Sequence, residues 1–495
     1  MSAVSNPKLI KYLILGAGPC GLGAAHRLNE LGETDWLVLE KQATPGGLAS
    51  SFVDSQGFVW DVGGHVVHSH YAYFDKVFHS AIGKTALKHQ REAWVWLEGR
   101  FVPYPFQNNL HRLTKKTQWD CVMGLLKLTY GSLQRRDLKT QNRSFQNWIL
   151  DRFGSGIAEH FLFPYNRKMW AYPLKKMNSS WVGDRVSAPN IIRWLKNLIL
   201  AQDDVAWGPN QVFYFPARGG TGALWQTIAA KLPPRKFHYH QTVIGLDIKA
   251  QTVTLQSGKV IRYQHLISTL PLTSLLTHTK FPTHRPPALT SPAITKTKKA
   301  LFSCAVHVVG IGLTGQPRPE LITKCWIYYP EPELPFFRVT VFSNYAPANV
   351  PHPGKQWSLM CEVSESPLKP KFISQTGQIA NSALIAAVIA GLIRAHLITK
   401  TDQIVSTWHH TALLGYPTPT LARETVLDGT LKALEAYQIY SRGRFGAWKY
   451  EVSNMDHTFM QGVEVVNRLI NQTPEVTVWH PQLVNRAHST SHSQT

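Results

Sequence analysis

The feature that most limits the possible fold is a glycine-rich turn near the start of the chain. An apolar run, Leu9–Leu15, has the character of a buried strand and leads directly into the sequence GAGPCG. A helical pattern follows, and a second apolar strand covers Trp36–Leu39. Strand, turn, helix and strand make a βαβ unit, whose two strands lie parallel in one sheet. We therefore predict an α/β fold.

The glycines of this turn have the spacing of a dinucleotide-binding fingerprint. Gly16, Gly18 and Gly21 form G-x-G-x-x-G between strand and helix. The first permits the tight turn, the second lets the backbone approach a pyrophosphate, and the third lets helix and strand pack closely. Glu40 ends the second strand about 20 residues further on, where it can accept hydrogen bonds from a ribose. This predicts a Rossmann-like nucleotide site; a purely structural glycine turn is the alternative.

Composition excludes several classes of protein. Of the 495 residues, 44% are apolar and 17% charged, which supports a packed core and excludes a disordered or fibrous chain. Lys and Arg number 52 against 30 Asp and Glu, a net charge of +22 that favours an anionic partner such as nucleic acid, an acidic membrane face or a phosphorylated small molecule. The five cysteines are scattered, so we predict no metal site and a reducing, cytoplasmic location.

The chain shows neither a targeting segment nor a membrane span, because its longest apolar runs are interrupted by polar groups. We therefore expect a soluble protein without membrane insertion. A hairpin is predicted around Glu98-Gly99, helices between about 110 and 205, and strands from 211 to 275. Residues 276–299 carry four prolines and read as a linker or domain edge. Further strands are expected over 300–313, 325–329, 336–343 and 357–364, then helices over 379–397 and 459–470.

A second motif selects FAD over NAD as the cofactor. The stretch from Glu40 through Pro45, Gly46, Gly47 and Leu48 resembles the second fingerprint of the glutathione-reductase-2 flavoprotein group. PARGGTGALW (216–225), LISTLPL (266–272) and the block at 441–462 are similar to later segments of that group. The resemblance implies a discontinuous FAD-binding domain (1–90, 207–285 and 415–475). It also implies an inserted helical substrate domain (106–206) and a mainly antiparallel β-sheet domain (90–105 and 286–414). Residues 476–495 are expected to be a disordered tail.

Seven further segments resemble the UDP-galactopyranose mutase family, in particular its eukaryotic-type branch. They are DVGGHVVHSHYAYFD (61–75), VPYPFQNN (102–109), PYNRKMWAYP (164–173), GDRVSAPN (183–190), WGPNQVFYFPARGGTG (207–222), HHTALLGYPTPT (409–420) and SRGRFGAWKYEVSN (441–454). The family interconverts UDP-galactopyranose and UDP-galactofuranose for cell-surface glycan biosynthesis, with N5 of reduced FAD attacking the anomeric carbon. The resemblance implies NADPH or NADH as electron donor, UDP-galactose as substrate and a homo-oligomer.

The resemblance also assigns substrate residues. The diphosphate needs arginine forks, implied to be Arg185 and Arg338, which we also predict to be catalytic. The remaining substrate residues implied by the family surround the uridine, the phosphates and the sugar: Tyr104, Phe106, Gln107, Asn166, Trp170, Asn210, Trp326, Tyr328, Tyr416, Tyr450 and Asn454.

For the cofactor, the family implies a loop around Gly64 and His65 that lies against the flavin, His65 being the third predicted catalytic residue. Further cofactor contacts are implied for Val243, Arg444, Asn454 and Asp456. Two residues depart from the family pattern near the expected flavin: His68, commonly a bulky apolar residue, and Met455, usually a glutamine. They bear on redox tuning more than on substrate identity.

Three other functions remain open at this level. A flavin amine oxidase or desaturase of the same fold would have no use for an arginine clamp. A non-catalytic binder similar to the GDP-dissociation inhibitors would need no flavin. Nucleic-acid binding is suggested only by net charge, and basic residues such as Lys115, Lys116, Arg135 and Arg136 read more simply as a solvated face, so no nucleic-acid partner is expected.

Overall fold

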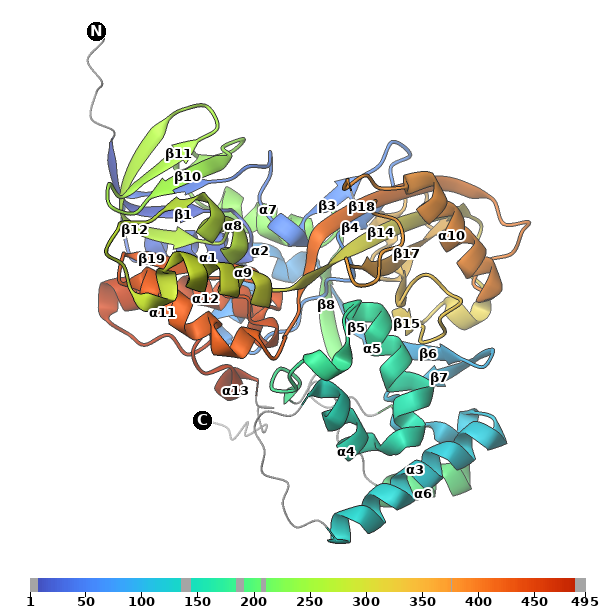
Figure 1. Cartoon of the computed structure of the whole chain (residues 1–495). Coiled ribbons are helices and arrows are strands. Elements are labelled where there is room, and N and C mark those ends of the chain that lie inside the picture. The colour runs from blue at the N-terminus through green and yellow to red at the C-terminus, as the bar shows by residue number, and fades with distance from the viewer. Residues whose placement is uncertain (1–7, 135–143, 184–190, 206–210, 375, 486–495) are drawn as a thin grey trace, which may run out of the picture.

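The structure is a computed structural model that describes residues 8–134, 144–183, 191–205, 211–374 and 376–485. Two large sheets stand side by side, and a helical lobe extends from the side of the second sheet (Figure 1). The lobe is built from α3 (Lys115–Gln134), α4 (Phe145–Ile157), α5 (Phe163–Trp170) and α6 (Ile191–Leu200). The fold is therefore mixed α/β, which confirms the predicted class.

The first sheet is built around the predicted βαβ unit. β1 (Leu9–Leu15) lies parallel between β12 (Val260–Ser268) and β2 (Trp36–Leu39). The sheet continues with β9 (Phe237–His238) at one end and, at the other, β10 (Val243–Asp247), β11 (Thr252–Leu255), β13 (Thr279–Lys280) and β19 (Ile439–Ser441). Neighbouring residues of β1 enter different cores, because side chains alternate between the two faces of a strand.

Helices cover both faces of this sheet. On one face, α1 (Pro19–Glu30), α2 (Ala72–Ile82), α7 (Gly222–Ala230) and α12 (Met455–Asn471) share a core with Tyr12 and Ile14. On the other, α8 (Leu272–His278), α9 (Ser291–Ala300) and α11 (Leu427–Glu435) lie over Leu13 and Leu15 (Figure 1). A buried parallel sheet of this kind explains the continuous apolar run of β1.

Two glycines bring α1 and α12 into direct backbone contact. A Cβ on Gly23 would lie 2.1 Å from the Phe459 carbonyl oxygen, and a Cβ on Gly462 would lie 2.0 Å from that of Cys20. Only glycine fits at either position, because no side chain can be accommodated at such distances. This contact fixes the start of α12 beside the glycine turn.

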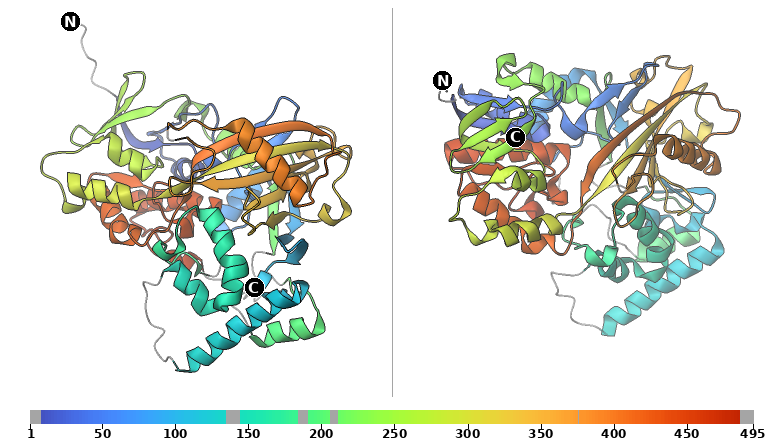
Figure 2. Two further views of the ribbon diagram at one scale, coloured as in Figure 1. Left: turned by 45° about the vertical axis from the view of Figure 1, so that its right-hand side comes forward. Right: turned by 45° about the horizontal axis from the view of Figure 1, so that its top comes forward.

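The second sheet is almost wholly antiparallel. Its order is β18 (Ile404–Pro417), β14 (Ser303–Thr314), β17 (Gln356–Glu365), β16 (Arg338–Val341), β15 (Trp326–Tyr328), β6 (Ala93–Leu97) and β7 (Arg100–Pro103). Figure 2 shows α10 (Asn381–Arg394) lying across one face of this sheet. The remaining strands form two antiparallel pairs. These are β3 (Ser51–Val53) with β4 (Val59–Asp61), and β5 (Ala86–Gln90) with β8 (Val212–Pro216).

Most predicted elements are present, with three corrections. Residues 276–299, expected as a linker or domain edge, form β13 and most of α9, and the region 211–275, expected as strands, also contains α7. The hairpin turns at Glu98 and Gly99, both with positive φ, as predicted. The expected disorder from residue 476 is wrong for residues 476–485, where Val478 is fully buried and α13 (Pro481–Val484) forms. The Thr477 hydroxyl donates to Glu464 (2.7 Å) and Lys449 donates to the Val478 carbonyl (2.9 Å), so burial and hydrogen bonds hold this segment. The boundaries given for the three domains stay a prediction.

Candidate active site

The glycine turn between β1 and α1 leaves open space at its centre. Gly16 has a φ of 98°, which favours glycine. A Cβ on Gly21 would lie 1.9 Å from the Gly16 carbonyl oxygen, so helix and strand meet here without room for a side chain. By contrast, a Cβ on Gly18 would have its nearest neighbour at 3.9 Å. The middle glycine thus faces space that a pyrophosphate can enter, beside the N–H groups of the helix start.

Glu40 lies next to this turn and is almost fully buried. Its carboxylate accepts hydrogen bonds from the Ala17 amide (2.7 Å) and the Gln42 amide (2.8 Å), which fix its orientation. A carboxylate held in this way retains lone pairs for ribose hydroxyls. The chemistry of this end therefore fits the adenosine half of FAD.

The second fingerprint packs onto the first. The Gly46 amide donates to the Ala17 carbonyl (2.9 Å), and a Cβ on Gly47 would lie 3.3 Å from Cα of Gly18. Gly46 and Gly47 both have positive φ, at 125° and 57°. Leu48 and Val243, predicted as cofactor contacts, are half-buried against the core that contains Leu13 and Leu15 of β1.

The loop that carries His65 is held from both sides. The Gly64 amide donates to Glu362 (3.1 Å), and the Thr221 hydroxyl donates to the His65 carbonyl (3.0 Å). Nδ1 of His65 is buried and has no hydrogen-bond partner among the described residues. Burial, with Arg444 and Arg338 nearby, lowers the pKa of His65 to about 3. The imidazole is therefore neutral at physiological pH.

Arg338, at the start of β16, lies directly against this loop. A Cβ on Gly64 would be 3.2 Å from its Nη2. Its Nε and Nη2 donate to the two oxygens of Glu362 at 2.7 and 2.8 Å, a bidentate pair. Although burial alone would lower it, the Glu362 carboxylate holds the pKa of Arg338 well above its ordinary value. Glu362 thus joins the histidine loop to the arginine, and the sequence analysis missed it.

An aromatic wall surrounds Arg338. The ring of Tyr328 lies 5.5 Å from that of Tyr104 and 5.1 Å from that of Tyr165. Tyr416 and Tyr450 follow, with ring centroids 6.0 Å apart. All five tyrosines are half-buried, and burial raises the pKa of Tyr104 to about 12. Burial also raises the pKa of Tyr165 and of Tyr416, so the hydroxyls of these three tyrosines remain protonated and can donate hydrogen bonds at neutral pH.

The sequence analysis missed two members of this wall. Tyr165 lies between Tyr328 and Phe337, and Trp181 packs against Trp170 (5.2 Å) and Tyr450 (5.2 Å). Tyr165 lies in the quoted segment PYNRKMWAYP, which was a usable signal. Trp181 lies outside every quoted segment.

The remaining predicted substrate residues divide into two groups. Phe106, Gln107, Asn166 and Trp170 are buried, and Phe106 stacks on Phe161 at 4.6 Å. They therefore lie behind the half-buried tyrosines of the site. Trp326 is also buried, with the guanidinium of Arg91 5.0 Å from its ring. Arg185 and Asn210 lie outside the described residues.

Arg444 and Asn454 lie where the second sheet meets α12. Arg444 donates to the carbonyls of Gly415 (2.8 Å) and Ser453 (3.2 Å), and its guanidinium lies 5.2 Å from the Tyr416 ring. Burial lowers the pKa of Arg444. Asn454 precedes α12, and its side chain makes no capping bond. It therefore keeps its amide available to a ligand.

Asp456 lies in the first turn of α12 and carries a buried oxygen, Oδ1, without a hydrogen-bond partner in the described part of the chain. Its Oδ2 accepts from the amide (3.0 Å) and ring (2.7 Å) of His70. Burial raises its pKa, but His457 and His70 outweigh this and lower it. The His68 ring lies 5.8 Å from that of His70, and Met455 is buried in the core beneath. Both departures from the family pattern thus lie beside Asp456.

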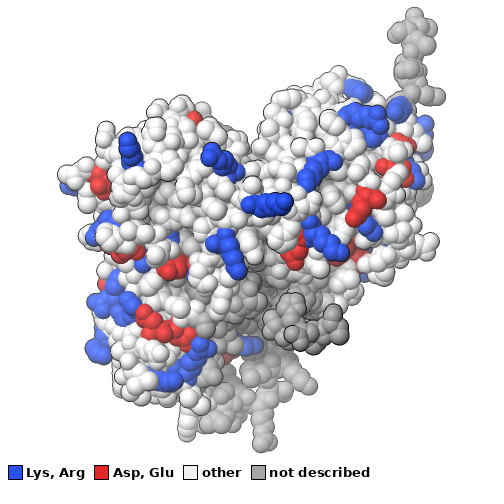
Figure 3. Space-filling model, turned by 180° about the vertical axis from the view of Figure 1, so that it is seen from behind, with Lys and Arg blue, Asp and Glu red and all other residues white. Residues whose placement is uncertain are grey.

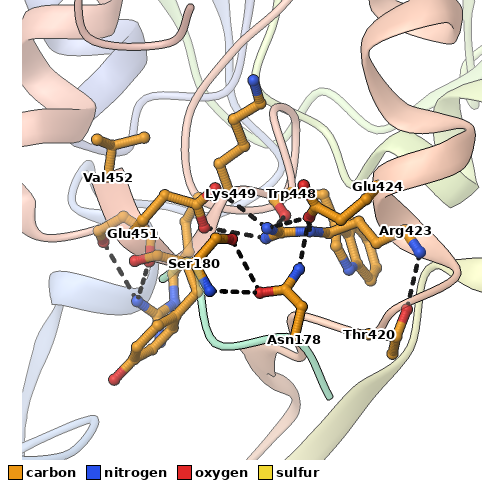
Figure 4. A network of polar contacts seen from close by, with 12 residues as sticks. Asn178, Ser180, Thr420, Arg423, Glu424, Trp448, Lys449, Glu451 and Val452 are labelled. Atoms are coloured by element: carbon orange, nitrogen blue, oxygen red, sulfur yellow. Dashed lines mark hydrogen bonds and ion pairs between the residues drawn. The ribbon is translucent and has the colours of Figure 1, made fainter. Parts of the chain in front are cut away.

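A buried polar network around Arg423 connects the segment that carries Tyr450 to neighbouring parts of the chain (Figure 4). Arg423 donates to both oxygens of Glu451 (3.0 and 3.1 Å) and to the Trp448 carbonyl (3.1 Å). Asn178, from the helical lobe, donates to Glu424 (2.8 Å). The network joins three chain segments, one of which includes the residues on either side of Tyr450, so it ties the backbone there to the lobe.

Comparison with known proteins agrees with this geometry. The model of the flavin-containing amine oxidoreductase family matches residues 19–416. A crystal structure of reduced UDP-galactopyranose mutase is 43% identical, with a TM-score of 0.90, over 97% of this chain and 98% of the other. The chain belongs to the UDP-galactopyranose mutase family. This confirms the resemblance drawn from the sequence, and a flavoenzyme fold with it.

More distant structures share only the fold of the UDP-galactopyranose mutase family. A putative protoporphyrinogen oxidase from Exiguobacterium is 13% identical with a TM-score of 0.69, over 94% of this chain and 100% of the other. A putrescine oxidase with bound putrescine is 14% identical with a TM-score of 0.63, over 94% and 99%.

The surface gives two further observations. Lys and Arg are scattered over the back of the molecule rather than gathered in one patch (Figure 3). Among the described helices, none combines the length and apolar character needed to cross a bilayer.

Proposed function

We propose that the protein interconverts UDP-galactopyranose and UDP-galactofuranose on reduced FAD. The observation that supports this most is Arg338, which projects among tyrosine hydroxyls beside the histidine loop of a flavoenzyme fold. A guanidinium held in place by Glu362, with further N–H groups facing a half-buried wall of tyrosines, suits a diphosphate. A cationic amine would be repelled by Arg338, and a polyene would leave that charge without a partner, which disfavours the oxidase and desaturase alternatives.

Each part of the substrate would have its own contacts. Arg338, with Arg185, would bind the diphosphate and stabilise the charge that develops when UDP leaves. The hydroxyls of Tyr328, Tyr416 and Tyr450 would donate to the phosphate oxygens. Tyr104 would stack on the uracil, and Gln107 would shape its pocket. Asn454 would contact the sugar.

The flavin would lie between the glycine turn and the histidine loop, with Glu40 on its ribose. Reduced FAD supplies a nucleophilic N5 for the anomeric carbon, and NADPH or NADH would supply the electrons. Neutral His65 would hold or accept a proton at Nδ1, the atom that lacks a partner in the described residues. The tyrosine wall would exclude water during the rearrangement.

The wider setting is also part of this proposal. We expect a cytoplasmic homo-oligomer that supplies galactofuranose for cell-surface glycans, with no nucleic-acid partner. The absence of a metal requirement is likewise expected. The ligand atoms of His70, Asp456 and His457 lie within 4.8 Å of one another, but His70 and Asp456 already bond to each other.

The test is chromatographic. The purified yellow protein is incubated with UDP-galactofuranose, with and without dithionite, and the mixture is analysed for UDP-galactopyranose. Conversion only after reduction supports the proposal. A folded protein with reducible flavin that converts none of the substrate refutes it and favours another flavoenzyme activity of this fold.

A further inference from the structure

Helix α6 is oriented with its apolar side toward solvent. Trp194 and Asn197 point inward and are 4% and 6% exposed. Both bond to Asn108, Trp194 through Nε1 (3.1 Å) and Asn197 through Nδ2 (3.1 Å). Ile192 and Ile199, by contrast, are 82% and 78% exposed. The inner face is thus held by hydrogen bonds and by the packing of Trp194, and no residue in the described part of the chain covers the aliphatic face.

The neighbouring helix α3 adds a second apolar row. Trp119, Leu126 and Tyr130 are exposed, and their spacing places them on one side of the helix. On its inner side, α3 shares a hydrophobic cluster with Trp194 of α6. Both helices lie at the outer end of the helical lobe (Figures 1 and 2), and the cluster between them continues into β6 and β7 of the second sheet. We call their outward surface the lobe face; it comprises Trp119, Leu126, Tyr130, Ile192, Leu195, Ile199 and Leu200.

The charge on these two helices is predominantly positive. The basic residues on α3 and α6 are Lys115, Lys116, Lys127, Arg193 and Lys196, all exposed, and the one acid is Asp120. Asp120 forms an ion pair with His160 (3.0 Å), and Arg193 pairs with Asp204. Lys116 has Asp120 one turn further along α3, but that carboxylate already pairs with His160; Lys115, Lys127 and Lys196 have no acid one turn away on their helices. Apolar side chains with an amphipathic Trp and Tyr, flanked by lysines, are typical of helices that lie in the plane of a membrane surface.

We propose that the lobe face binds an anionic phospholipid surface peripherally. The apolar residues would enter the headgroup region, and the lysines would contact the lipid phosphates and carboxylates. A second copy of the chain fits less well, because a two-fold contact through this face would bring lysines against lysines with only Asp120, already paired with His160, among the acids of these helices. The inference is independent of the proposed function. It involves no spanning segment.

The test is sedimentation of the full-length flavoprotein with vesicles. Phosphatidylcholine vesicles containing phosphatidylserine should bind the protein, and vesicles of phosphatidylcholine alone should bind it far less. High salt should weaken the binding, since surface charges are screened. An Ile192→Ser/Ile199→Ser variant should lose at least about tenfold in affinity, because two large aliphatic side chains would no longer be buried in lipid.

The matched control is Ile322→Ser/Leu413→Ser, since these aliphatic residues are also exposed (57% and 63%) but lie outside the lobe face. It should bind vesicles as the unmodified protein does. A Lys127→Glu/Lys196→Glu variant should lose binding to anionic vesicles, while its weak binding to vesicles of phosphatidylcholine alone should not change. Absence of binding to anionic vesicles, or equal binding by the Ile192→Ser/Ile199→Ser variant, refutes the proposal. Self-association without lipid that this variant abolishes would assign the face to a second copy instead.

Discussion

At the scale of single residues, the fork of Arg338 is the feature with the clearest consequence. Only arginine can make two parallel bonds to Glu362 and still present a further N–H to a phosphate. We therefore expect Arg338→Lys to keep the charge but to lose UDP affinity by about tenfold or more. A binding titration measures this, with flavin content checked by absorbance. An affinity within about twofold of the unmodified protein would remove Arg338 from the diphosphate site.

The low pKa of His65 makes a prediction about stability. Burial lowers the pKa to about 3 in the folded protein, whereas the unfolded chain has the ordinary value of about 6.5. Below pH 6.5 the unfolded state therefore binds a proton that the folded state does not. The free energy of unfolding consequently decreases as the pH is lowered. Between pH 7 and 5 this amounts to about 2 kcal/mol.

A His65→Gln variant should lack this contribution. Its unfolding free energy, measured with urea, should fall about 2 kcal/mol less than that of the unmodified protein between pH 7 and 5. Its turnover should fall by about a hundredfold, since the loop would lose the imidazole next to the reacting atoms. Parallel pH profiles of stability for the two proteins would contradict the buried, neutral histidine.

At the scale of elements, the contact between α1 and α12 is open to a direct test. A Cβ at position 462 would lie 2.0 Å from the Cys20 carbonyl, which belongs to the backbone and cannot easily move. Gly462→Ala should therefore lower stability by about 1–3 kcal/mol and reduce the flavin content. Gly429→Ala in α11 is the control, because a Cβ there meets nothing within 4 Å. Differential scanning calorimetry and the flavin absorbance compare the two, and similar behaviour would contradict the close contact.

The network around Arg423 connects elements distant in sequence. Arg423→Met would leave Glu451 buried without its cation, at a cost of about 3–5 kcal/mol. The double variant Arg423→Met/Glu451→Met removes both charges and should be more stable than the single variant. Urea unfolding of both proteins measures this. A double variant less stable than the single one would show that the unpaired charge of Glu451 is not the main cause of the stability lost in Arg423→Met.

The elements also mark the limit of sequence-based prediction. β1, β2 and the hairpin at Glu98 were predictable because apolar runs and turn residues are local signals. Glu362 was not, because an acid within a largely apolar strand gives no sign of its partners, which come from residues 64 and 338. The outward apolar face of α6 was equally hidden, since periodicity predicts an amphipathic helix but not which face is buried.

At the scale of the whole molecule, the site combines all three structural parts. The glycine turn belongs to the first sheet, Arg338 and Tyr328 to the second, and Tyr165 to the helical lobe. Quoted motifs identified most of these residues. Their relative placement depended on tertiary packing: Tyr165 was within a quoted segment but its ring contacts were not predictable, and Trp181 entered the site through ring contacts that no quoted segment includes.

The pairing of the first sheet has a consequence for how the protein is made. β1 pairs with β12, β12 pairs with β19, and α1 packs on α12 near the other end of the chain. At roughly 5–20 residues per second, a ribosome needs about 25–100 s to finish a chain of this length. For about half of that time β1 lacks β12, one of its two neighbours, and until nearly the end α1 lacks α12, so nascent chains depend on protection from aggregation. An expression fragment that stops short of α12 is accordingly expected to be insoluble.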